Sequence, residues 1–380
     1  MDNKIRMAIT QGDTNGIGYE VILKTFGTPT MLELCTPIVY GNPRIASYHR
    51  KSCGLETDFL NIQNAEEAKA GELNLLVLDE AEVPVNLGKE TPTAAAQAFS
   101  SLQRALADWK EGKVDVLVTA PINKHSMQGE EFHFPGHTEY LEAEVGEGAK
   151  ALMILLNSSL RVALVTTHLP VSQIAPAITS ELIVEKVSVF DQSLKRDFGI
   201  EKPRIAVLSL NPHAGDGGTL GTEEQDIITP ALEKAHTELG INAFGPYAAD
   251  GFFGTRAYEQ FDGILAMYHD QGLAPFKALA MSDGVNFTAG LPLVRTSPDH
   301  GTAYDIVGKG VADETSFRQA VYTALDIFRN RLRYDEAREN PLPKLFRERR
   351  EDERRPRREP FSAAIKQPAD ETPEPMDTDE

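Results

Sequence analysis

The chain has 380 residues, of which 41% are hydrophobic, so it can bury a sizeable core as two ordinary domains or one large unit. Aspartate and glutamate (57) outnumber lysine and arginine (38), and the formal net charge of -19 opposes binding to nucleic acid and to anionic membranes. The two cysteines, Cys35 and Cys53, are too few for a disulfide framework and lack zinc-knuckle spacing, which favours a reduced cytosolic setting. The N-terminus lacks the apolar segment of a signal peptide, and no stretch approaches the roughly 20 apolar residues that span a bilayer, so a soluble cytoplasmic protein is expected.

Apolar segments of strand length alternate with longer amphipathic segments along the chain. The expected strands lie within residues 5–10, 36–41, 73–79, 114–121, 151–157, 160–168, 203–213 and 263–272. The expected helices begin near residues 18, 180 and 222 or span residues 93–112 and 314–333. Because the strands are too uniformly apolar to leave one face in water, they predict a mainly parallel sheet covered on both sides, and therefore an α/β fold.

The C-terminal segment, residues 340–380, differs in composition from the rest of the chain. Residues 347–360 mix basic and acidic side chains around prolines, and residues 368–380 are acidic and nearly free of large apolar groups. Such a segment buries too little apolar surface to offset the entropy of ordering it, so it is predicted to be a disordered charged tail. Its interleaved glutamates favour a solvated tail over a segment that binds nucleic acid.

Three of the nine histidines come directly after an apolar strand: His168, His213 and His269. The carboxyl ends of parallel strands share one edge of a sheet, where open α/β folds place their ligands, so the three imidazoles could converge there. Three histidine nitrogens can hold a divalent metal and leave coordination positions open for a substrate. The residues alone leave open the alternative that each is an independent loop histidine.

Groups suited to an anionic substrate lie near these strands. They are His137, Thr138, Lys277, Asn286 and Arg295. Lysine and arginine offer charge-assisted hydrogen bonds to phosphate or carboxylate, and threonine and asparagine add neutral ones. An isolated lysine or arginine is usually only a surface charge, but here the two cations stand among glycines, prolines and apolar residues. That setting favours a binding role.

Two glycine-rich stretches follow predicted strands, but neither is a dinucleotide-binding fingerprint. Residues 12–18 (GDTNGIG) do not match G-x-G-x-x-G, and residues 213–221 (HAGDGGTLG) lack the acidic residue that should close a following strand. The second stretch could hold phosphate through backbone N–H groups or only form tight turns, and both readings stay open. A G-x-S-x-G elbow and a P-loop are absent from the sequence, which weakens serine hydrolase and NTPase interpretations.

Five segments together resemble the 4-hydroxythreonine-4-phosphate dehydrogenase family of vitamin B6 biosynthesis. They are residues 119–124 (TAPINK), 134–141 (FPGHTEYL), 211–224, 266–277 and 284–310. The resemblance runs from the N-terminus to about residue 335. It implies two α/β/α lobes with a largely parallel sheet and an active-site cleft between the lobes, similar to isocitrate and isopropylmalate dehydrogenases. The first lobe would comprise residues 1–130 and about 300–336, and the second, with the metal-binding histidines, about 131–299.

The resemblance also implies an activity. The family oxidises 4-phosphooxy-L-threonine with NAD or NADP to 2-amino-3-oxo-4-phosphooxybutanoate. This product loses carbon dioxide to give 3-amino-2-oxopropyl phosphate on the way to pyridoxal 5'-phosphate. Family members are homodimers with one divalent metal ion, for which zinc, magnesium and cobalt are the candidates, near the subunit interface. The nicotinamide cofactor is bound without a Rossmann fingerprint, so no cofactor-binding residue is assigned.

The family's functional residues carry over by matched motif. The metal ligands would be His168, His213 and His269. The substrate contacts would be His137, Thr138, Lys277, Asn286 and Arg295. Asp250 matches a family aspartate near the active site. The family usually reads GDPAGIGPE where this chain reads GDTNGIGYE, with Thr14, Asn15 and Tyr19 as the departures, and that loop is expected to line the cleft.

Two other functions remain open. The same fold and metal could act on a sugar-acid phosphate such as 4-phospho-D-threonate or 4-phospho-D-erythronate. A metal-dependent phosphatase would instead release inorganic phosphate and ignore NAD. A non-catalytic binding module fits the density of site motifs least.

Overall fold

The computed structural model of the chain describes residues 4–127, 134, 136–146, 148–280 and 282–342. The chain divides into residues Met1–Glu339, which form one compact unit, and residues Asn340–Glu380. The predicted charged tail lies outside the described residues from residue 343 onward, so its disorder stays a prediction. The division of the first unit into two lobes also stays a prediction. Among the described helices, none is long and apolar enough to cross a membrane.

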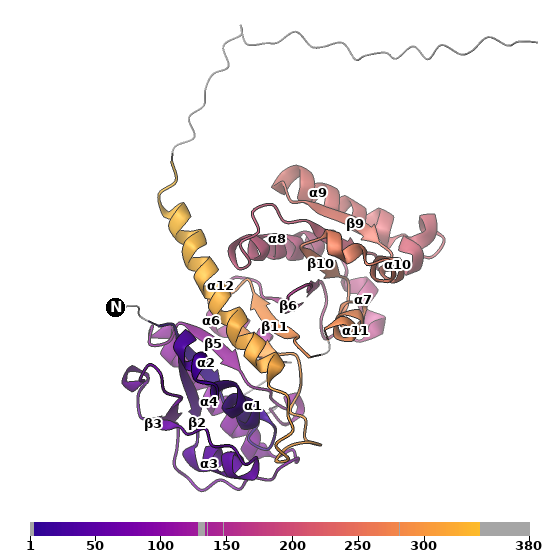
Figure 1. Cartoon of the computed structure of the whole chain (residues 1–380). Helices are drawn as coiled ribbons and strands as arrows, with labels where there is room; N and C mark the ends of the chain where they lie inside the picture. The colour runs from indigo at the N-terminus through magenta and orange to yellow at the C-terminus, as the bar shows by residue number, and fades with distance from the viewer. Residues whose placement is uncertain (1–3, 128–133, 135, 147, 281, 343–380) are drawn as a thin grey trace, which may run out of the picture. The chain divides into compact units, whose positions relative to one another are not determined.

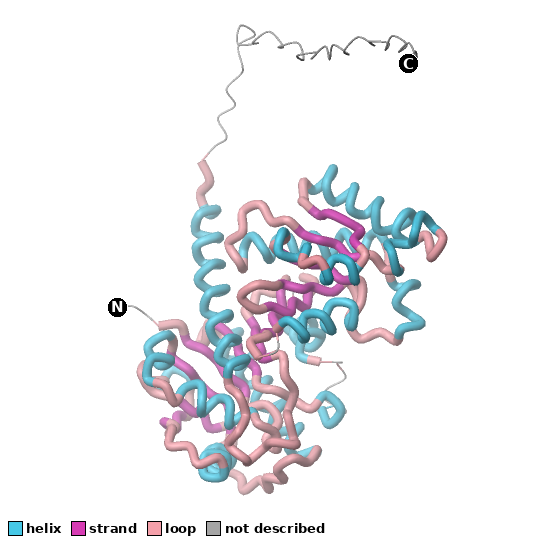
Figure 2. Tube along the Cα trace, turned by 45° about the vertical axis from the view of Figure 1, so that its right-hand side comes forward, coloured by secondary structure: helices cyan, strands magenta, loops and turns pink. Residues whose placement is uncertain are grey.

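The first unit is built on one sheet of twelve strands in the order β3-β4-β2-β1-β5-β12-β11-β6-β7-β10-β8-β9. The strands are β1 (Arg6–Thr10), β2 (Thr36–Gly41), β3 (Leu60–Ile62), β4 (Asn74–Val77), β5 (Val116–Thr119), β6 (Leu152–Leu156), β7 (Arg161–Leu164), β8 (Ile205–Leu208), β9 (Ala243–Tyr247), β10 (Gly263–Ala266), β11 (Val285–Ala289) and β12 (Arg295–Pro298). Helices flank these strands, as Figure 2 shows by colour, and the predicted α/β fold is confirmed.

The sheet contains two parallel blocks that run in opposite directions. Strands β3, β4, β2, β1, β5 and β12 are parallel to their neighbours, and so are β7, β10, β8 and β9. Between the blocks, β11 and β6 pair antiparallel with each other and with β12 and β7. This antiparallel pair reverses the strand direction, so the carboxyl ends of the two blocks lie at opposite ends of the strands.

The sheet is covered on both faces because its strands are apolar on both. On β5, Val116 and Val118 belong to one buried cluster while Leu117, between them, belongs to another. On β1, Ile9 and Ala8 divide in the same way. Successive strand residues point to opposite faces, so this alternation places a hydrophobic core on each side. The uniformly apolar strands of the sequence are explained by this double burial.

The helices follow from local signals at their termini and from one apolar side each. They are α1 (Gly18–Phe26), α2 (Pro29–Leu34), α3 (Pro43–Ser52), α4 (Pro92–Lys110), α5 (Lys124–Met127), α6 (His137–Val145), α7 (Val171–Ala177), α8 (Ser180–Arg196), α9 (Thr229–Leu239), α10 (Ala249–Gly254), α11 (His269–Leu279) and α12 (Thr315–Glu339), with shorter turns η1 (Ala65–Glu67), η2 (Pro212–Gly218), η3 (Glu224–Ile228) and η4 (Ala257–Gln260). The Thr91 hydroxyl caps α4 by accepting from Ala94 N at 3.2 Å, and Pro92 stands in its first turn.

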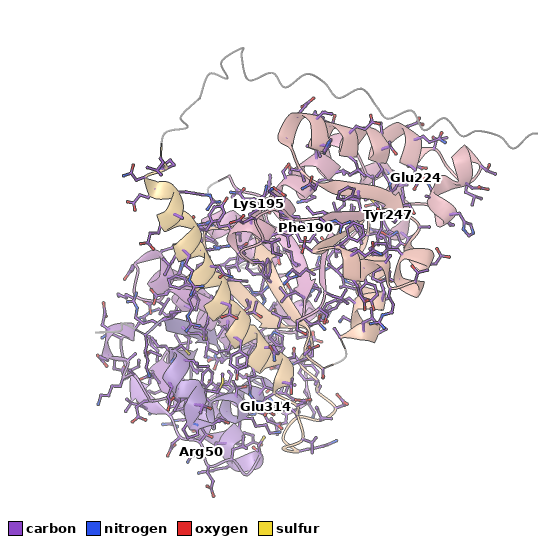
Figure 3. All side chains as sticks on the ribbon, turned by 45° about the horizontal axis from the view of Figure 1, so that its top comes forward. Arg50, Phe190, Lys195, Glu224, Tyr247 and Glu314 are labelled. Carbon is purple, nitrogen blue, oxygen red and sulfur yellow. The ribbon has the colours of Figure 1, made fainter. Side chains whose placement is uncertain are left out.

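Two helices show how the sheet's faces are closed. The long α12 packs on β12, β5 and β11 and also contacts α1 and α8, and Figure 1 shows it running diagonally across the unit. On α8, Phe190, labelled in Figure 3, packs against β10 at Gly263, where an added Cβ would lie 2.4 Å from the ring. Only glycine therefore allows α8 to approach β10 this closely.

The three strands followed by histidines are direct neighbours. β10 pairs with β7 on one side and with β8 on the other, all in parallel. His168 follows β7, His269 follows β10, and His213 follows β8. All three histidines thus follow the carboxyl ends of neighbouring parallel strands, as expected.

Candidate active site

A cavity of about 260 Å³ lies where the first parallel block meets the antiparallel pair. Five strands that are consecutive across the sheet, β5, β12, β11, β6 and β7, contribute to its lining or lead directly into it, and the first turn of α6 completes it. Four of the five predicted substrate contacts line it, namely His137, Thr138, Asn286 and Arg295, together with the predicted metal ligand His168.

Arg295 forms the buried end of the cavity and is 3% exposed. Its Nε and Nη2 donate to Thr119 Oγ1 at 3.1 and 2.7 Å, and its Nη1 donates to Thr288 Oγ1 at 3.2 Å. Nη2 also donates to His137 Nδ1 at 2.9 Å. Burial lowers the pKa of Arg295 to about 9, which still leaves a cation at neutral pH. Three neighbouring side chains therefore hold one fixed positive charge in place.

His137 is a neutral imidazole with a defined tautomer. Because Arg295 donates to Nδ1, that nitrogen carries no proton and Nε2 does. Burial, and after it the positive charges of Arg295 and Lys124, lowers the pKa of His137 well below its usual value. The ring can therefore donate a hydrogen bond from Nε2 to an anion without carrying a charge of its own.

The first turn of α6 also faces the cavity. Its cap residue, Gly136, offers no side chain to the first N–H groups. Thr138 Oγ1 lies 3.5 Å from Thr288 Oγ1. A helix N-terminus without a side-chain cap, close to a buried arginine, favours a bound anion.

Lys277 lies beside the cavity and is not among the residues that line it. Its Nζ lies 3.4 Å from Asp299 Oδ1 and donates to the Asp299 carbonyl oxygen at 3.5 Å. Asp299 does line the cavity. Burial raises the pKa of Asp299, and the positive charge of Lys277 opposes that rise. Lys277 is thus a cation at the rim that is already paired.

His168 stands at the open end of the cavity between a carboxylate and an ammonium group. Lys124 Nζ lies 3.4 Å from His168 Nε2, and His168 Nδ1 lies 3.3 Å from Glu139 Oε1. An ammonium can only donate, so Nε2 accepts and Nδ1 donates its proton to Glu139. Burial opposes ionisation of Glu139, but hydrogen bonds, first of all from His168, hold its pKa below the usual value.

His269 resembles His168 in its surroundings. Its Nδ1 lies 2.8 Å from Asp270 Oδ1, and the two imidazole centroids are 6.0 Å apart. At both imidazoles a carboxylate engages Nδ1, which is the usual arrangement around a metal-ligating histidine, but Nε2 of His168 also accepts from Lys124. The donor chemistry of these two imidazoles fits a divalent metal, which would take the place of Lys124 at His168 Nε2.

His213 lies elsewhere, in a second cavity of about 540 Å³ that Asp250 and Tyr268 also line. The two cavities share no described lining residue. Within the described ranges, no three His, Cys, Asp or Glu side chains gather closely enough to hold a metal ion. The structure therefore brings two of the three histidines together, and the complete triad stays a prediction, as does the role of Asp250.

The backbone around His213 is unusual. Residues 213–217 all have positive φ, with values of 52° at His213, 52° at Ala214 and 44° at Asp216. Non-glycine residues in this region cost on the order of 1–3 kcal/mol each and cluster at functional sites. Gly215 and Gly217 share the same torsion range, so the glycines of this stretch are accounted for by the tight turn.

The N-terminal loop does not line the cavity, contrary to expectation. Thr14, Asn15 and Tyr19 are at most 1% exposed. Asn15 Nδ2 donates to Lys89 O at 2.8 Å, and the Tyr19 hydroxyl donates to Gln11 Oε1 at 2.6 Å. The departures from the family loop are buried because they bind neighbouring segments of their own part of the sheet.

Three buried polar atoms around the cavity have no hydrogen-bond partner in the described part of the chain. They are Glu139 Oε2, Asn286 Oδ1 and His300 Nε2. Buried polar groups are nearly always paired, so unpaired ones in a cavity wall indicate a missing ligand or water. The cavity is built to hold a polar molecule.

Sequence reasoning missed several residues of this site. Thr119, Lys124, Glu139, Asp299 and His300 all line the cavity. Each lies inside a segment that carries the family resemblance, but none follows a strand in the way that singled out the histidines. Only the motifs that carry the family resemblance could have identified these residues from the sequence.

Comparison with known proteins is consistent with this site. A family model described as pyridoxal phosphate biosynthetic protein PdxA matches residues 33–324. A Bacteroides thetaiotaomicron protein named 4-hydroxythreonine-4-phosphate dehydrogenase is 62% identical over 351 residues, which cover 92% of this chain and 96% of the relative. A protein of the same name from Sulfurihydrogenibium is 39% identical over 84% of this chain and 98% of the relative.

Solved structures agree. The crystal structure of 4-hydroxythreonine-4-phosphate dehydrogenase from Klebsiella pneumoniae superposes with a TM-score of 0.74 and 34% identity, covering 86% of this chain and 98% of that one. The matched family model and the identity to these relatives extend over most of the chain. The chain therefore belongs to the family of the pyridoxal phosphate biosynthetic protein PdxA.

Proposed function

We propose that the chain oxidises 4-phosphooxy-L-threonine with NAD or NADP to 2-amino-3-oxo-4-phosphooxybutanoate. This product then decarboxylates to 3-amino-2-oxopropyl phosphate in the biosynthesis of pyridoxal 5'-phosphate. The observation that carries the proposal is the cavity, in which Arg295 and Lys124 line the wall and Lys277 stands at the rim. A small substrate with a phosphate at one end and a carboxylate at the other fits these charges, and the relatives are named for such a substrate.

The phosphate is assigned to the buried end. Arg295 supplies a fixed positive charge, His137 donates from Nε2, and Thr138 and the N–H groups of α6 add neutral donors. Asn286 supplies a side-chain amide, and Lys277 adds charge from the rim. The phosphate does not react, so these contacts provide orientation and specificity through binding energy remote from the reacting carbon.

The reacting carbon is assigned to the open end, beside His168 and His269. These two side chains, with His213, would hold one divalent metal ion, and zinc, magnesium and cobalt remain candidates. When bound, such an ion supplies Lewis-acid polarisation of substrate oxygen atoms. Glu139 and Asp270 orient the two adjacent imidazoles through their Nδ1 atoms.

A second copy of the chain is part of this proposal. His213 and Asp250 line a different cavity from His168, so a homodimer with the metal site near its interface is one way to unite the three histidines. The nicotinamide cofactor is proposed without assigned residues. The two cysteines are free thiols, which supports a reduced compartment such as the cytoplasm.

The test is turnover. The purified chain should reduce NAD or NADP when given 4-phosphooxy-L-threonine, and a chelator should abolish the reaction until a divalent metal is returned. Assays with 4-phospho-D-threonate and 4-phospho-D-erythronate measure the sugar-acid alternative in parallel. Release of inorganic phosphate without nicotinamide reduction would contradict the proposal and favour a phosphatase.

A further inference from the structure

The cations around the cavity differ in how many hydrogen-bond donors remain for a ligand. A guanidinium has five N–H donors. Arg295 directs four of them to Thr119, Thr288 and His137. One N–H therefore remains, and the side chain is almost fully buried. Arg295 contributes charge and a single further donor.

Lys277 is also partly engaged. Its ammonium group is paired with the Asp299 carboxylate at 3.4 Å and hydrogen-bonded to the same residue's carbonyl oxygen. An anionic ligand must compete with that carboxylate. Lys277 is therefore a weaker candidate for a second anion than its position suggests.

Among the described cations around the cavity, Lys124 has the most donors without a described partner. It begins α5, just past the carboxyl end of β5, and its side chain lines the cavity. An ammonium has three donors, and among the described residues Lys124 hydrogen-bonds to one partner, His168 Nε2 at 3.4 Å. It forms no ion pair with any carboxylate in the described ranges. Two donors of a cation that is not ion-paired with any described carboxylate thus remain at the open end.

We propose that Lys124 binds the carboxylate group of the substrate. The inference rests on the proposed function, because it takes the substrate to carry one phosphate and one carboxylate. The phosphate is assigned to Arg295, His137 and the start of α6, so the carboxylate needs a separate cation. Lys124 touches His168, and the carboxylate-bearing carbon of 4-phosphooxy-L-threonine is directly bonded to the carbon that is oxidised.

The charges around Lys124 favour the same assignment. The positive charges of Arg295 and Lys277 both act on the Lys124 ammonium, while Glu139 is the carboxylate that acts on it with the opposite sign. A second anion between these cations relieves their repulsion. The phosphate satisfies one part of the cluster, and the carboxylate completes it.

The experiment compares two ligands that differ only in the carboxylate. 4-Phosphooxy-L-threonine and 3-amino-2-hydroxypropyl phosphate are titrated calorimetrically into the protein without nicotinamide, so that neither is oxidised. Lys124→Met should weaken binding of the first ligand about tenfold to a hundredfold, the loss typical of one charged hydrogen bond. It should leave the affinity for the second ligand unchanged.

Matched variants identify the cause. Lys124→Arg keeps the charge and should recover most of the affinity for the carboxylate ligand. Arg295→Met should weaken both ligands, since both carry the phosphate. Lys110→Met removes an exposed lysine that pairs with Glu144 outside the cavity, and it should change neither affinity. Metal content and the thermal unfolding midpoint are matched between all variants.

Equal loss of both ligands in Lys124→Met would assign Lys124 to the phosphate and overturn the inference, as would unchanged binding of both. If the unmodified chain binds neither ligand, the proposed function falls and the inference falls with it. If it binds both and Lys124→Met loses both equally, the inference alone is overturned.

Discussion

The two ends of the cavity are built differently. At the buried end, Arg295 is held by Thr119, Thr288 and His137 and has one free donor. At the open end, Lys124 and His168 contact each other and few other described groups. The buried end is pre-organised by the protein, whereas at the open end two donors of Lys124 have no described partner.

The difference indicates a division of labour. A pre-organised cation pays its ordering entropy during folding, so it can recognise an anion with little rearrangement. At the open end, the two remaining donors of Lys124 gain a partner only when a ligand binds. Recognition of the unreactive phosphate suits the first arrangement, and contact with the reacting part of the substrate suits the second.

The largest effect is expected from removing His213, the third histidine proposed to hold the metal at the open end. His213→Ala should lose bound metal and abolish nicotinamide reduction, because loss of one ligand removes most of the affinity of a three-histidine site. Metal content by elemental analysis and turnover are the measurements. His236→Ala, which removes an exposed histidine on α9, should change neither. Stoichiometric metal and full activity in His213→Ala would show that the triad is wrong.

The buried end is tested by removing its charge. Arg295→Ala should lower kcat/KM roughly tenfold to a hundredfold or more, because a charged hydrogen bond to an anion contributes on the order of 1.5–3 kcal/mol. The unmodified chain should discriminate strongly against unphosphorylated 4-hydroxythreonine, and the variant should lose part of that discrimination. An equal relative loss on both substrates would move the phosphate site away from Arg295.

The neutral His137 makes stability depend on pH. Its pKa is held below the ordinary 6.5, first by burial and then by Arg295 and Lys124, so below that pH the unfolded chain binds the extra proton. The free energy of unfolding should therefore fall on acidification, by up to about 1.4 kcal/mol per pH unit for this group.

Urea unfolding of the unmodified chain and of His137→Gln at several pH values between about 7.5 and 5.5 checks this expectation, since titration below an unperturbed pKa of about 6.5 falls in that window. The variant should show the shallower pH dependence. His236→Gln serves as the exposed control. Identical slopes for His137→Gln and the unmodified chain would contradict a neutral, buried His137.

The smallest effect is expected from removing the C-terminal charged segment, which is part of neither end of the cavity. A chain ending at Asn340 should fold and turn over like the full chain, because residues Met1–Glu339 form a compact unit by themselves and the removed segment is highly charged. Thermal unfolding and kcat/KM are compared between the two chains. A large drop in either would show that the tail contributes to the folded unit or to the site.

Local sequence pattern was sufficient for the fold class, for most of the strands and for the position of three histidines after strands, but it did not find β3, β9, β11 and β12. Uniformly apolar strands alternating with amphipathic helices predicted an α/β sheet buried on both faces, and the alternating clusters of β5 confirm it. His168, His213 and His269 were found because each directly follows an apolar strand. These features can be read from a few consecutive residues, because a buried strand requires a short run of apolar side chains.

The tertiary structure decided which of these groups share a cavity. Asn286 lies on β11 and Arg295 on β12. The hydrophobic pattern did not predict these two strands because they contain polar residues. In the sheet they lie between β5 and β6, which are distant from them in the sequence. Lys124 meets His168 across 44 residues, and His213, although it follows a strand like the other two, lines another cavity. Strand order and direction depend on how apolar faces far apart in the chain pack together. The hydrophobic periodicity of a short segment carries no information about either.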